Sequence, residues 1–322
     1  MVVQGGQHMV VDVGGSHVTA AAVGTAAVGR AGSGGARLLS RVERLVDSHA
    51  SSAAVLDAWA SACVEAAAGA GIDPGGCDWG LAMPGPFDYE RGVGHYAGVG
   101  KFERLAGVDI RSALSERLGA HPDRIRFVHD AGAYGIGEWR FGAPTRHARF
   151  VCVTLGTGVG SAFVDDGSLV FDRADVPPGG EVHRLPFDGR DLEETVSTRA
   201  LLARYASSDP GLSVKDLAGL ARAGDARAQH EFDTAMEALA LAVGPWLREF
   251  EATALVVGGS ISRSWDVLER GFRSGLDACA PELAATLVIA PSRLLADAPL
   301  YGAAHLLERS AVGRCVTAPA LP

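Results

Sequence analysis

Short apolar stretches alternate along the chain with longer stretches in which apolar residues recur every three or four positions. The apolar, β-rich stretches predict strands, and in the first half they lie at 9–13, 17–23, 37–42, 79–83 ("WGLAM") and 125–130 ("IRFVHD"). The recurring pattern predicts helices, of which one runs from about residue 51 to 68 and another near 109–118. The apolar face of the first helix is formed by Leu56, Trp59, Ala60, Cys63, Val64 and Ala67. Strands and helices in alternation predict an α/β fold.

The second half of the chain opens like the first. When "VDVGGSHV" (11–18) is aligned with "VTLGTGVG" (153–160), Asp12 falls on Thr154, an offset of 154 − 12 = 142 residues. Two similar hairpins, each opening an α/β half, indicate a duplicated fold with a cleft between the halves. Glycine-containing hairpins are common, so a chance coincidence in a chain with 42 glycines is the alternative.

Two domains follow from this pattern. We expect a smaller α/β domain at 1–125, a larger one at 126–298, and a helix at about 300–310 that packs back on the first domain. The remaining predicted elements are helices around 197–207, 214–223, 226–250 and up to about 276, strands at 254–260 and 286–290, and a loose tail at 311–322.

Composition narrows the class of protein. The 322 residues are 48% hydrophobic and 21% charged, which is typical of a globular protein, and a formal net charge of −9 gives no basic surface for nucleic-acid phosphates. No apolar run approaches the roughly 20 residues that span a bilayer, and the first residues lack a signal-peptide pattern. The five cysteines stand singly, which indicates reduced thiols. We expect a cytoplasmic protein that binds neither nucleic acid nor a membrane.

Three glycine turns are candidates for binding phosphate, because backbone N–H groups approach oxygen atoms closely where no Cβ intervenes. Asp12 ends the strand before the first turn, where a carboxylate holds Mg²⁺, through water or phosphate, against a triphosphate. A tight turn without a ligand is the commoner interpretation of any single one. "GTGVGS" has Ser161 in place of the third glycine of a dinucleotide motif. The turns are Gly14, Gly15 and Ser16; Gly156, Thr157 and Gly158; and Gly258 and Gly259.

Asp130 stands where the strand "RFVHD" meets the small-residue helix "AGAYGIGEW". One interpretation is a helix N-cap. The other is a general base, which accepts the proton of a substrate hydroxyl as that hydroxyl attacks a γ-phosphoryl group.

The order of these motifs resembles that of the ROK family of sugar kinases. The resemblance runs from residue 10 to 306 and is carried by "VDVGGSH", "MPGPFD", "VHDAGAYGIGE", "VTLGTGVGSAFVDDG", "GGE" at 179–181, "VVGGSIS" and "YGAAHL". It implies the actin-like, hexokinase-type ATPase fold of two RNase-H-like halves, with sugar and ATP meeting in the cleft. It also implies a homodimer.

The resemblance assigns roles to particular residues. It implies that Asp130 is the catalytic base, that Asp12 lies at the metal and the phosphates, and that the second and third glycine turns lie at the phosphates and the adenosine. Glu181 and Glu193 match the two sugar-binding glutamates, although an exposed loop glutamate is usually only solvated. Gly85, His129 and His183 complete the set of residues that we expect to bind the substrate. For His183 the alternative is a loop histidine that does not contact the substrate.

The chain departs from the family pattern at three places. Most members carry a zinc site of one His and three Cys, whereas this chain has "GGEVHRLPFDGRDLEETVS" there, so no zinc is expected. His129 replaces the usual Asn before the catalytic Asp, which points to a change in sugar specificity. "HYAGVGKFERLAG" (95–107) lacks the usual Asn-Leu and Trp and offers Lys101 and Phe102, with a surface charge as the alternative for Lys101.

The sequence therefore predicts an ATP- and Mg²⁺-dependent kinase that phosphorylates the 6-hydroxyl of a glucose-like hexose or amino-hexose, glucose or kanosamine. A kinase of C7 cyclitols in secondary metabolism, such as antibiotic biosynthesis, is one alternative. A non-catalytic sugar-binding regulator is another, disfavoured because only 11 residues precede Asp12 where a helix-turn-helix domain would lie.

Overall fold

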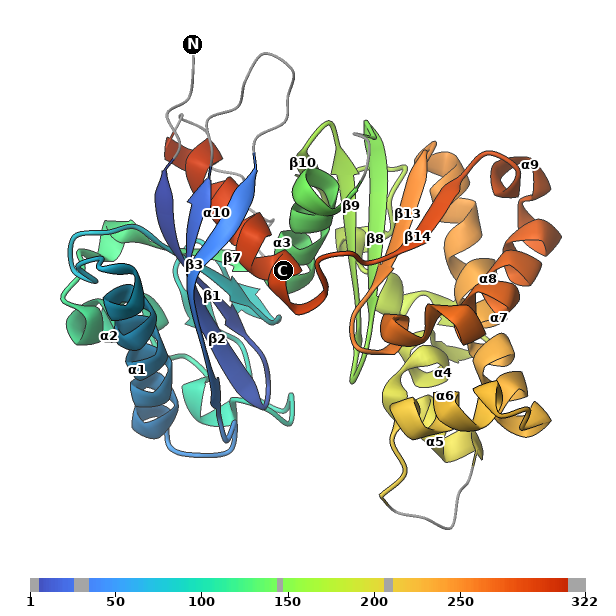
Figure 1. Cartoon of the computed structure of the whole chain (residues 1–322), viewed down its shortest axis with the longest axis horizontal. Helices are drawn as coiled ribbons and strands as arrows, with labels where there is room; N and C mark the ends of the chain where they lie inside the picture. The colour runs from blue at the N-terminus through green and yellow to red at the C-terminus, as the bar shows by residue number, and fades with distance from the viewer. Residues whose placement is uncertain (1–5, 26–34, 144–146, 206–210, 312–322) are drawn as a thin grey trace. The chain divides into compact units, whose positions relative to one another are not determined.

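The computed structural model describes residues 6–25, 35–143, 147–205 and 211–311. The chain divides into two compact units (Figure 1). One is formed by the described residues up to Phe141 together with those from Asp297 onward, and the other by Gly142–Ala296. The expected tail lies, from residue 312 onward, outside the described residues.

Each unit is built on a five-stranded sheet, and the two sheets have the same strand order. The first is ordered β3-β2-β1-β4-β7 and the second β10-β9-β8-β13-β14, with three antiparallel strands followed by two parallel ones in both. The duplication that the aligned hairpins predict is therefore present in the topology. The strands are β1 (Gln7–Val13), β2 (His17–Thr25), β3 (Ala36–Leu45), β4 (Trp79–Met83), β7 (Ile125–His129), β8 (Arg149–Leu155), β9 (Val159–Asp165), β10 (Ser168–Val170), β13 (Ala254–Gly258) and β14 (Val288–Pro291).

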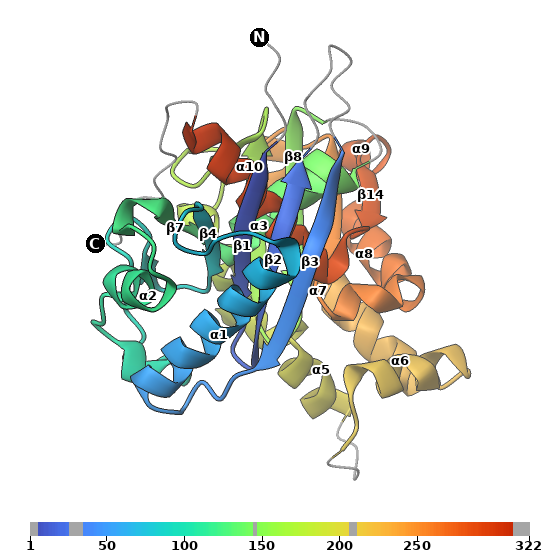
Figure 2. The same cartoon turned by 60° about the vertical axis from the view of Figure 1, so that its left-hand side comes forward.

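Helices cover both faces of the first sheet. Figures 1 and 2 show α1 on one face and α10 on the other. The α1 helix is long and apolar enough to span a membrane, but one face of it, including Trp59 and Cys63, is buried in the core of this unit. The short hairpin of β5 (Phe87–Asp88) and β6 (Val93–Gly94) was not predicted. The helices are α1 (Ser52–Ala70), α2 (Ile110–Leu118), α3 (Asp130–Gly137) and α10 (Ala298–Ala311).

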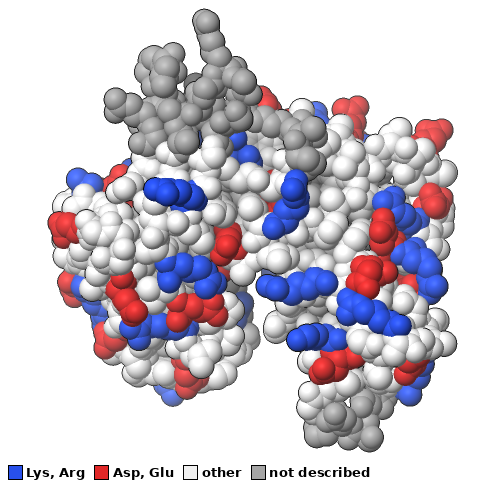
Figure 3. All heavy atoms as spheres, viewed as in Figure 1, with Lys and Arg blue, Asp and Glu red and all other residues white. Residues whose placement is uncertain are grey.

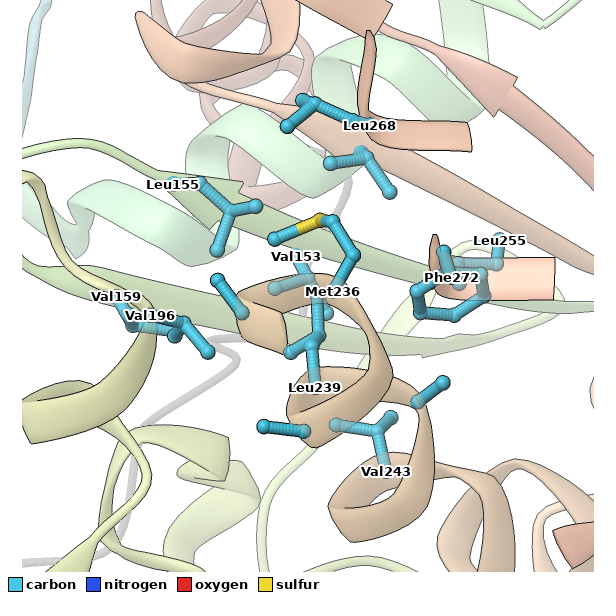
Figure 4. Close-up of a cluster of buried hydrophobic side chains, with 14 of the residues drawn as sticks. Val153, Leu155, Val159, Val196, Met236, Leu239, Val243, Leu255, Leu268 and Phe272 are labelled. Atoms are coloured by element: carbon cyan, nitrogen blue, oxygen red, sulfur yellow. The ribbon is translucent and has the colours of Figure 1, made fainter. Parts of the chain in front are cut away.

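The second unit packs most of its helices on one core (Figure 4). In that view Met236 of α7 lies beside Val153 and Leu155 of β8, and Leu239 and Val243 follow along the same helix in the same core. The helices are α4 (Glu193–Val196), α5 (Thr198–Tyr205), α6 (Val214–Arg222), α7 (Ala226–Glu249), α8 (Trp265–Cys279) and α9 (Pro281–Ala284), with a small hairpin of β11 (Pro186–Phe187) and β12 (Arg190–Asp191).

The α10 helix belongs to the first unit because small residues let it approach α3 closely. A Cβ on Gly302 would lie 1.8 Å from the carbonyl oxygen of Ala133, and a Cβ on Gly137 would lie 2.0 Å from that of Ala298. Leu300 and Leu307 then fill the face of the sheet around Val10. The expected helix at 300–310 thus lies on the N-terminal sheet.

The division between the units falls later than the expected boundary at 125/126. The strand β7 pairs in parallel with β4, and α3 packs against α10, so both elements belong to the first unit. The apolar pattern marks β7 as a strand but carries no information on which sheet it joins, since that depends on pairing with a distant strand.

Charged side chains on the face drawn in Figure 3 are interspersed. Over the described part of that face, Lys and Arg lie among Asp and Glu rather than in a single-sign basic surface.

A partly buried carboxylate ties α10 to the first sheet. Glu308 Oε1 lies 3.4 Å from His8 Nε2 and accepts a hydrogen bond from the Thr25 hydroxyl, and Glu308 Oε2 lies 3.7 Å from His305 Nδ1. Burial raises the pKa of Glu308, but its interactions with His305, His8 and Thr25 outweigh burial and hold that pKa well below the ordinary value.

We expect Glu308→Gln to lower the free energy of unfolding by about 1–3 kcal/mol at pH 7. The native carboxylate stabilises the fold above its unfolded pKa and loses this effect as pH falls, so the difference from the variant shrinks toward pH 3. Chemical denaturation at the two pH values measures it. Glu65→Gln, in an ion pair whose Glu65 side chain is 55% exposed, is the control and should cost less than about 1 kcal/mol. An equal loss at pH 3 and pH 7 would contradict the assignment.

Candidate active site

The first glycine turn joins β1 to β2. The N–H of Gly14 donates to the carbonyl of His17 across the turn at 2.9 Å, and the Ser16 hydroxyl lies 3.3 Å from His17 Nδ1. Gly15 and Ser16 are exposed at the tip. The tip of the turn is therefore exposed to solvent, while the hydrogen bond between Gly14 and His17 closes the hairpin below it.

Asp12 lies inside β1, opposite Thr19 of β2, and Thr19 lies opposite Glu43 of β3. Directly paired residues share one face of a sheet, so the two carboxylates lie along one row. Burial, which is the largest cause, and the negative charge of Asp130 together raise the pKa of the Asp12 carboxyl from 3.8 to about 7, against the lowering effect of Arg41. A cation placed at this carboxylate would relieve the cost of ionising it.

Asp130 is the first residue of α3 and directly follows β7. His129 occupies the N-cap position, without a capping side-chain hydrogen bond, so the N-cap interpretation of Asp130 is wrong. The Asp130 side chain is 39% exposed, and its Oδ1 accepts a hydrogen bond from the N–H of Ala131 at 2.6 Å. A partly exposed carboxylate in this position is a candidate acceptor for a proton.

His129 lies against the candidate base. Its Nε2 is 3.4 Å from Asp130 Oδ1, and its ring meets that of Tyr89 edge to face, with 6.0 Å between the centroids. Its Nδ1 is buried and hydrogen-bonds to no described residue. A proton on Nε2 would give the contact with Asp130 a donor.

The parallel strands of the first sheet bring these residues to one edge. Asp12 of β1 lies opposite Ala82 of β4, and Met83 of β4 lies opposite His129 of β7. Because the strands run in the same direction, their carboxyl ends meet. Asp12 and His129, 117 positions apart in sequence (129 − 12), thereby lie at the ends of two strands that are separated by β4 alone.

Gly85 lies at the same edge, two residues after β4. The turn that contains it is held by two tyrosines: the Tyr96 hydroxyl donates to the Pro84 carbonyl at 3.0 Å, and the Tyr89 hydroxyl donates to that of Met83 at 3.2 Å. The atom nearest to a Cβ built on Gly85 is the Tyr89 hydroxyl at 3.9 Å, so the glycine leaves open space there.

Lys101 lies beside the first glycine turn. Its Cδ is 3.7 Å from the position that a Cβ on Gly15 would take. The next residue, Phe102, is fully buried and donates its N–H to the Ser48 carbonyl at 3.0 Å, which fixes the backbone that carries the lysine. Lys101 is half-buried, with its stem beside a candidate phosphate turn, and a surface charge stays the alternative for it.

The second and third glycine turns touch one another in the second unit. The strands β8 and β13 are parallel, with Gly258 opposite Thr154, so the turns that follow them lie at one edge. A Cβ on Gly259, where φ is +80°, would lie 2.2 Å from the Leu155 carbonyl oxygen, which restricts this position to glycine. A Cβ on Gly156 would lie 3.4 Å from Ser260 Oγ.

The turn from Gly156 to Gly158 is anchored at both ends. The N–H of Gly156 donates to the Gly158 carbonyl at 3.0 Å, and the Gly156 carbonyl accepts from the N–H of Thr198 at 2.9 Å. Thr157 and Gly158 are exposed. Sequence reasoning missed Thr198, because its backbone contact is set by where α5 begins and not by its side chain.

Glu181 and His183 lie on a short loop that Ser161 holds in place. The Ser161 hydroxyl donates to the Gly180 carbonyl and accepts from the N–H of Val182 at 3.1 Å. Glu181 Oε2 lies 3.3 Å from Arg184 Nε and 4.0 Å from His183 Nε2. Ser161, which interrupts the dinucleotide pattern, thus has a structural role. His183 lies beside Glu181 on the same loop.

Glu193 lies against the second glycine turn rather than on the loop of Glu181. Its Oε2 accepts a hydrogen bond from the N–H of Val159 at 2.8 Å. Between the two glutamates, β11 and β12 form a hairpin closed by the N–H of Leu192 donating to the Leu185 carbonyl at 2.9 Å, and both leucines are buried. Among the residues that the structure describes, no three His, Cys, Asp or Glu side chains gather to hold a metal ion.

Comparison with known proteins shows which family this chain belongs to. The model of the ROK family matches residues 76–310. The chain belongs to the ROK family. The glucokinase of Thermotoga maritima is 29% identical over 254 residues, 71% of this chain and 78% of that protein. An N-acetyl-D-glucosamine kinase of Salmonella heidelberg is 26% identical over 246 residues, 70% of this chain and 78% of that protein.

A solved structure supports the same family. The crystal structure of a ROK hexokinase from Thermus thermophilus superposes with a TM-score of 0.70 at 26% identity, over 93% of this chain and 97% of that one. Together with the repeated sheet topology, this similarity confirms the predicted α/β, actin-like ATPase fold of two duplicated halves.

We expect Asp12→Asn to raise the free energy of unfolding at pH 8, without Mg²⁺ or nucleotide, by about 1–4 kcal/mol. The folded protein keeps the Asp12 proton up to about pH 7. The unfolded chain loses it near pH 4, so the natural protein loses stability between these values and the variant does not. Denaturation at pH 4 and pH 8 measures the difference. Asp123→Asn, whose side chain is 91% exposed, is the control. A gain of equal size at pH 4 would show that ionisation is not the cause.

Proposed function

We propose that this chain is an ATP-dependent kinase that phosphorylates the 6-hydroxyl of a glucose-like hexose or amino-hexose. The observation that carries the proposal is Asp130: a partly exposed carboxylate at a strand end, in the first turn of a helix and beside His129. Membership of the family and its similarity to a glucokinase and an N-acetyl-D-glucosamine kinase support the same activity.

In the proposed reaction Asp130 accepts the proton of the 6-hydroxyl as that oxygen attacks the γ-phosphorus of ATP. The bond from O6 to phosphorus forms, the bond from phosphorus to the bridging oxygen of ADP breaks, and the proton passes to the carboxylate. Positioning dominates catalysis of such transfers, which suits the rigid strand end on which Asp130 lies.

The proposal assigns the phosphates to the glycine turns. Exposed backbone at Gly15 and Ser16 in the first unit, and at Thr157 and Gly158 in the second, supplies N–H donors. Lys101, whose stem lies beside Gly15, adds a positive charge. The adenosine is assigned to the turn of Gly258 and Gly259.

The residues of the first unit fit Mg²⁺. Mg²⁺ in phosphoryl-transfer enzymes is held by one or two carboxylates together with the substrate's phosphates, and its charge neutralises those phosphates. Asp12 is such a carboxylate, and its pKa is raised to about 7 in the ion-free protein, first by burial and then by the charge of Asp130, so a cation there would favour its charged form. We propose that Asp12 holds Mg²⁺ through water or phosphate. The expected homodimer and cytoplasmic location stay predictions.

The proposal assigns the sugar to Glu181, Glu193, His183, Gly85 and His129. A hexose or amino-hexose is favoured because a 6-hydroxyl acceptor is shared by the substrates that the relatives' names give. Kanosamine and C7 cyclitols stay in competition with glucose because of His129, whose imidazole offers different hydrogen bonds from an asparagine amide.

We expect Asp130→Asn to lower kcat by about 10²–10⁴-fold, because the amide cannot accept the proton of the hydroxyl. A coupled assay for ADP release with Mg-ATP and glucose or kanosamine measures it. Asp123→Asn should leave kcat unchanged, and circular dichroism should show that both variants are folded. Retained turnover in Asp130→Asn would remove Asp130 from the mechanism.

We expect His129→Asn to shift the ratio of kcat/KM for kanosamine over glucose toward glucose by about tenfold, the scale of one altered hydrogen bond in a substrate site. The same coupled assay is run with glucose, mannose, N-acetylglucosamine, kanosamine and a valienone-type cyclitol. An unchanged ratio would mean that His129 acts on the base and not on specificity. No turnover on any of these substrates by the natural protein would favour the non-catalytic sugar-binding alternative.

A further inference from the structure

The carboxylate of Glu193 lies against the second glycine turn. Its Oε2 accepts the N–H of Val159 at 2.8 Å and lies 2.9 Å from where a Cβ on Gly158 would be. Gly158 is exposed and belongs to the turn that the proposed function assigns to phosphate, whereas Val159, which follows it, is buried. A negative charge therefore already lies beside a turn that the proposed function assigns to phosphate.

Nothing in the described part of the second unit neutralises this carboxylate with an ion pair. The only polar contact of Glu193 side-chain atoms that the structure gives among the described residues is the one with Val159. A triphosphate and a carboxylate at the same turn repel each other, and in a partly buried setting that repulsion is only weakly screened. Nucleotide binding therefore favours a state in which Glu193 has left the turn.

The turn keeps its shape without Glu193. Its own closure, from the N–H of Gly156 to the Gly158 carbonyl, and its tie from the N–H of Thr198 to the Gly156 carbonyl, do not involve the glutamate side chain. Rotation of the side chain away from Val159 thus frees the N–H and leaves the phosphate site formed.

We propose that Glu193 couples sugar binding to nucleotide binding. In the sugar-free protein its carboxylate holds the N–H of Val159 and weakens nucleotide binding, and hydroxyl groups of the sugar then compete for the carboxylate and free the turn. This inference rests on the proposed function, in which Glu193 contacts the sugar. It makes the sugar a positive effector for ATP at the same site, with a reciprocal effect of nucleotide on sugar affinity.

The test is the affinity for Mg-AMPPNP without sugar, measured by isothermal titration calorimetry. We expect Glu193→Gln to bind it about tenfold more tightly than the natural protein, within the 5–150-fold range of such couplings. The neighbouring Glu194→Gln, on an exposed side chain, is the matched control and should bind like the natural protein. Saturating sugar should tighten binding about tenfold in the natural protein and less than threefold in Glu193→Gln.

Unchanged or weaker binding of Mg-AMPPNP by Glu193→Gln without sugar would overturn the inference. If Glu193 only stabilised the turn, removing its charge would weaken the binding of Mg-AMPPNP. Failure of the proposed function looks different. A natural protein that binds Mg-AMPPNP but phosphorylates no sugar contradicts the kinase activity, while tighter binding by Glu193→Gln in that same protein still supports the blocking contact.

Discussion

The hydrogen-bonded pairing of parallel strands is the constraint on which the candidate site depends. In the first unit β1, β4 and β7 pair so that Asp12, Met83 and His129 lie at neighbouring strand ends. In the second, β8 and β13 pair so that the turns after Leu155 and Gly258 touch. Backbone pairing fixes register to one residue, so a slip by one position would turn every side chain of a strand to the other face. No side-chain interaction near the site has comparable reach.

Two carboxylates lie where negatively charged ligands are proposed to bind. In the ligand-free protein, keeping a negative charge at each of these places costs free energy. Asp12 is half-buried, and this burial, followed by the negative charge of Asp130, raises its pKa. Glu193 lies over a turn whose N–H groups suit phosphate. Such arrangements destabilise the ligand-free protein and become favourable only when a cation or a hydrogen-bonding substrate arrives, which is common at functional sites. The cost is therefore a feature of the ligand-free state.

The loop between Glu181 and Glu193 shows how the fold tolerates the loss of a metal motif. Where most family members have cysteines, a two-stranded hairpin buries Leu185 and Leu192 and closes on itself through backbone hydrogen bonds. Apolar burial and local pairing supply the order that metal ligation supplies elsewhere. Glu193 comes two residues after the last residue of this hairpin, so the hairpin also sets where α4 begins.

Much of this protein is determined by the sequence alone. Apolar periodicity marks nearly all of the long strands and helices, and the aligned glycine hairpins reveal the duplication, because both depend on local backbone preferences. Tertiary structure decided the features that depend on distant partners. It places β7 in the first sheet and lets α10 approach Ala133 at Gly302. It also places Lys101 beside Gly15 and brings Glu193 to the N–H of Val159. These contacts join positions tens to hundreds of residues apart, and the spacing of residues along a chain does not encode which of them pairing and packing will bring together.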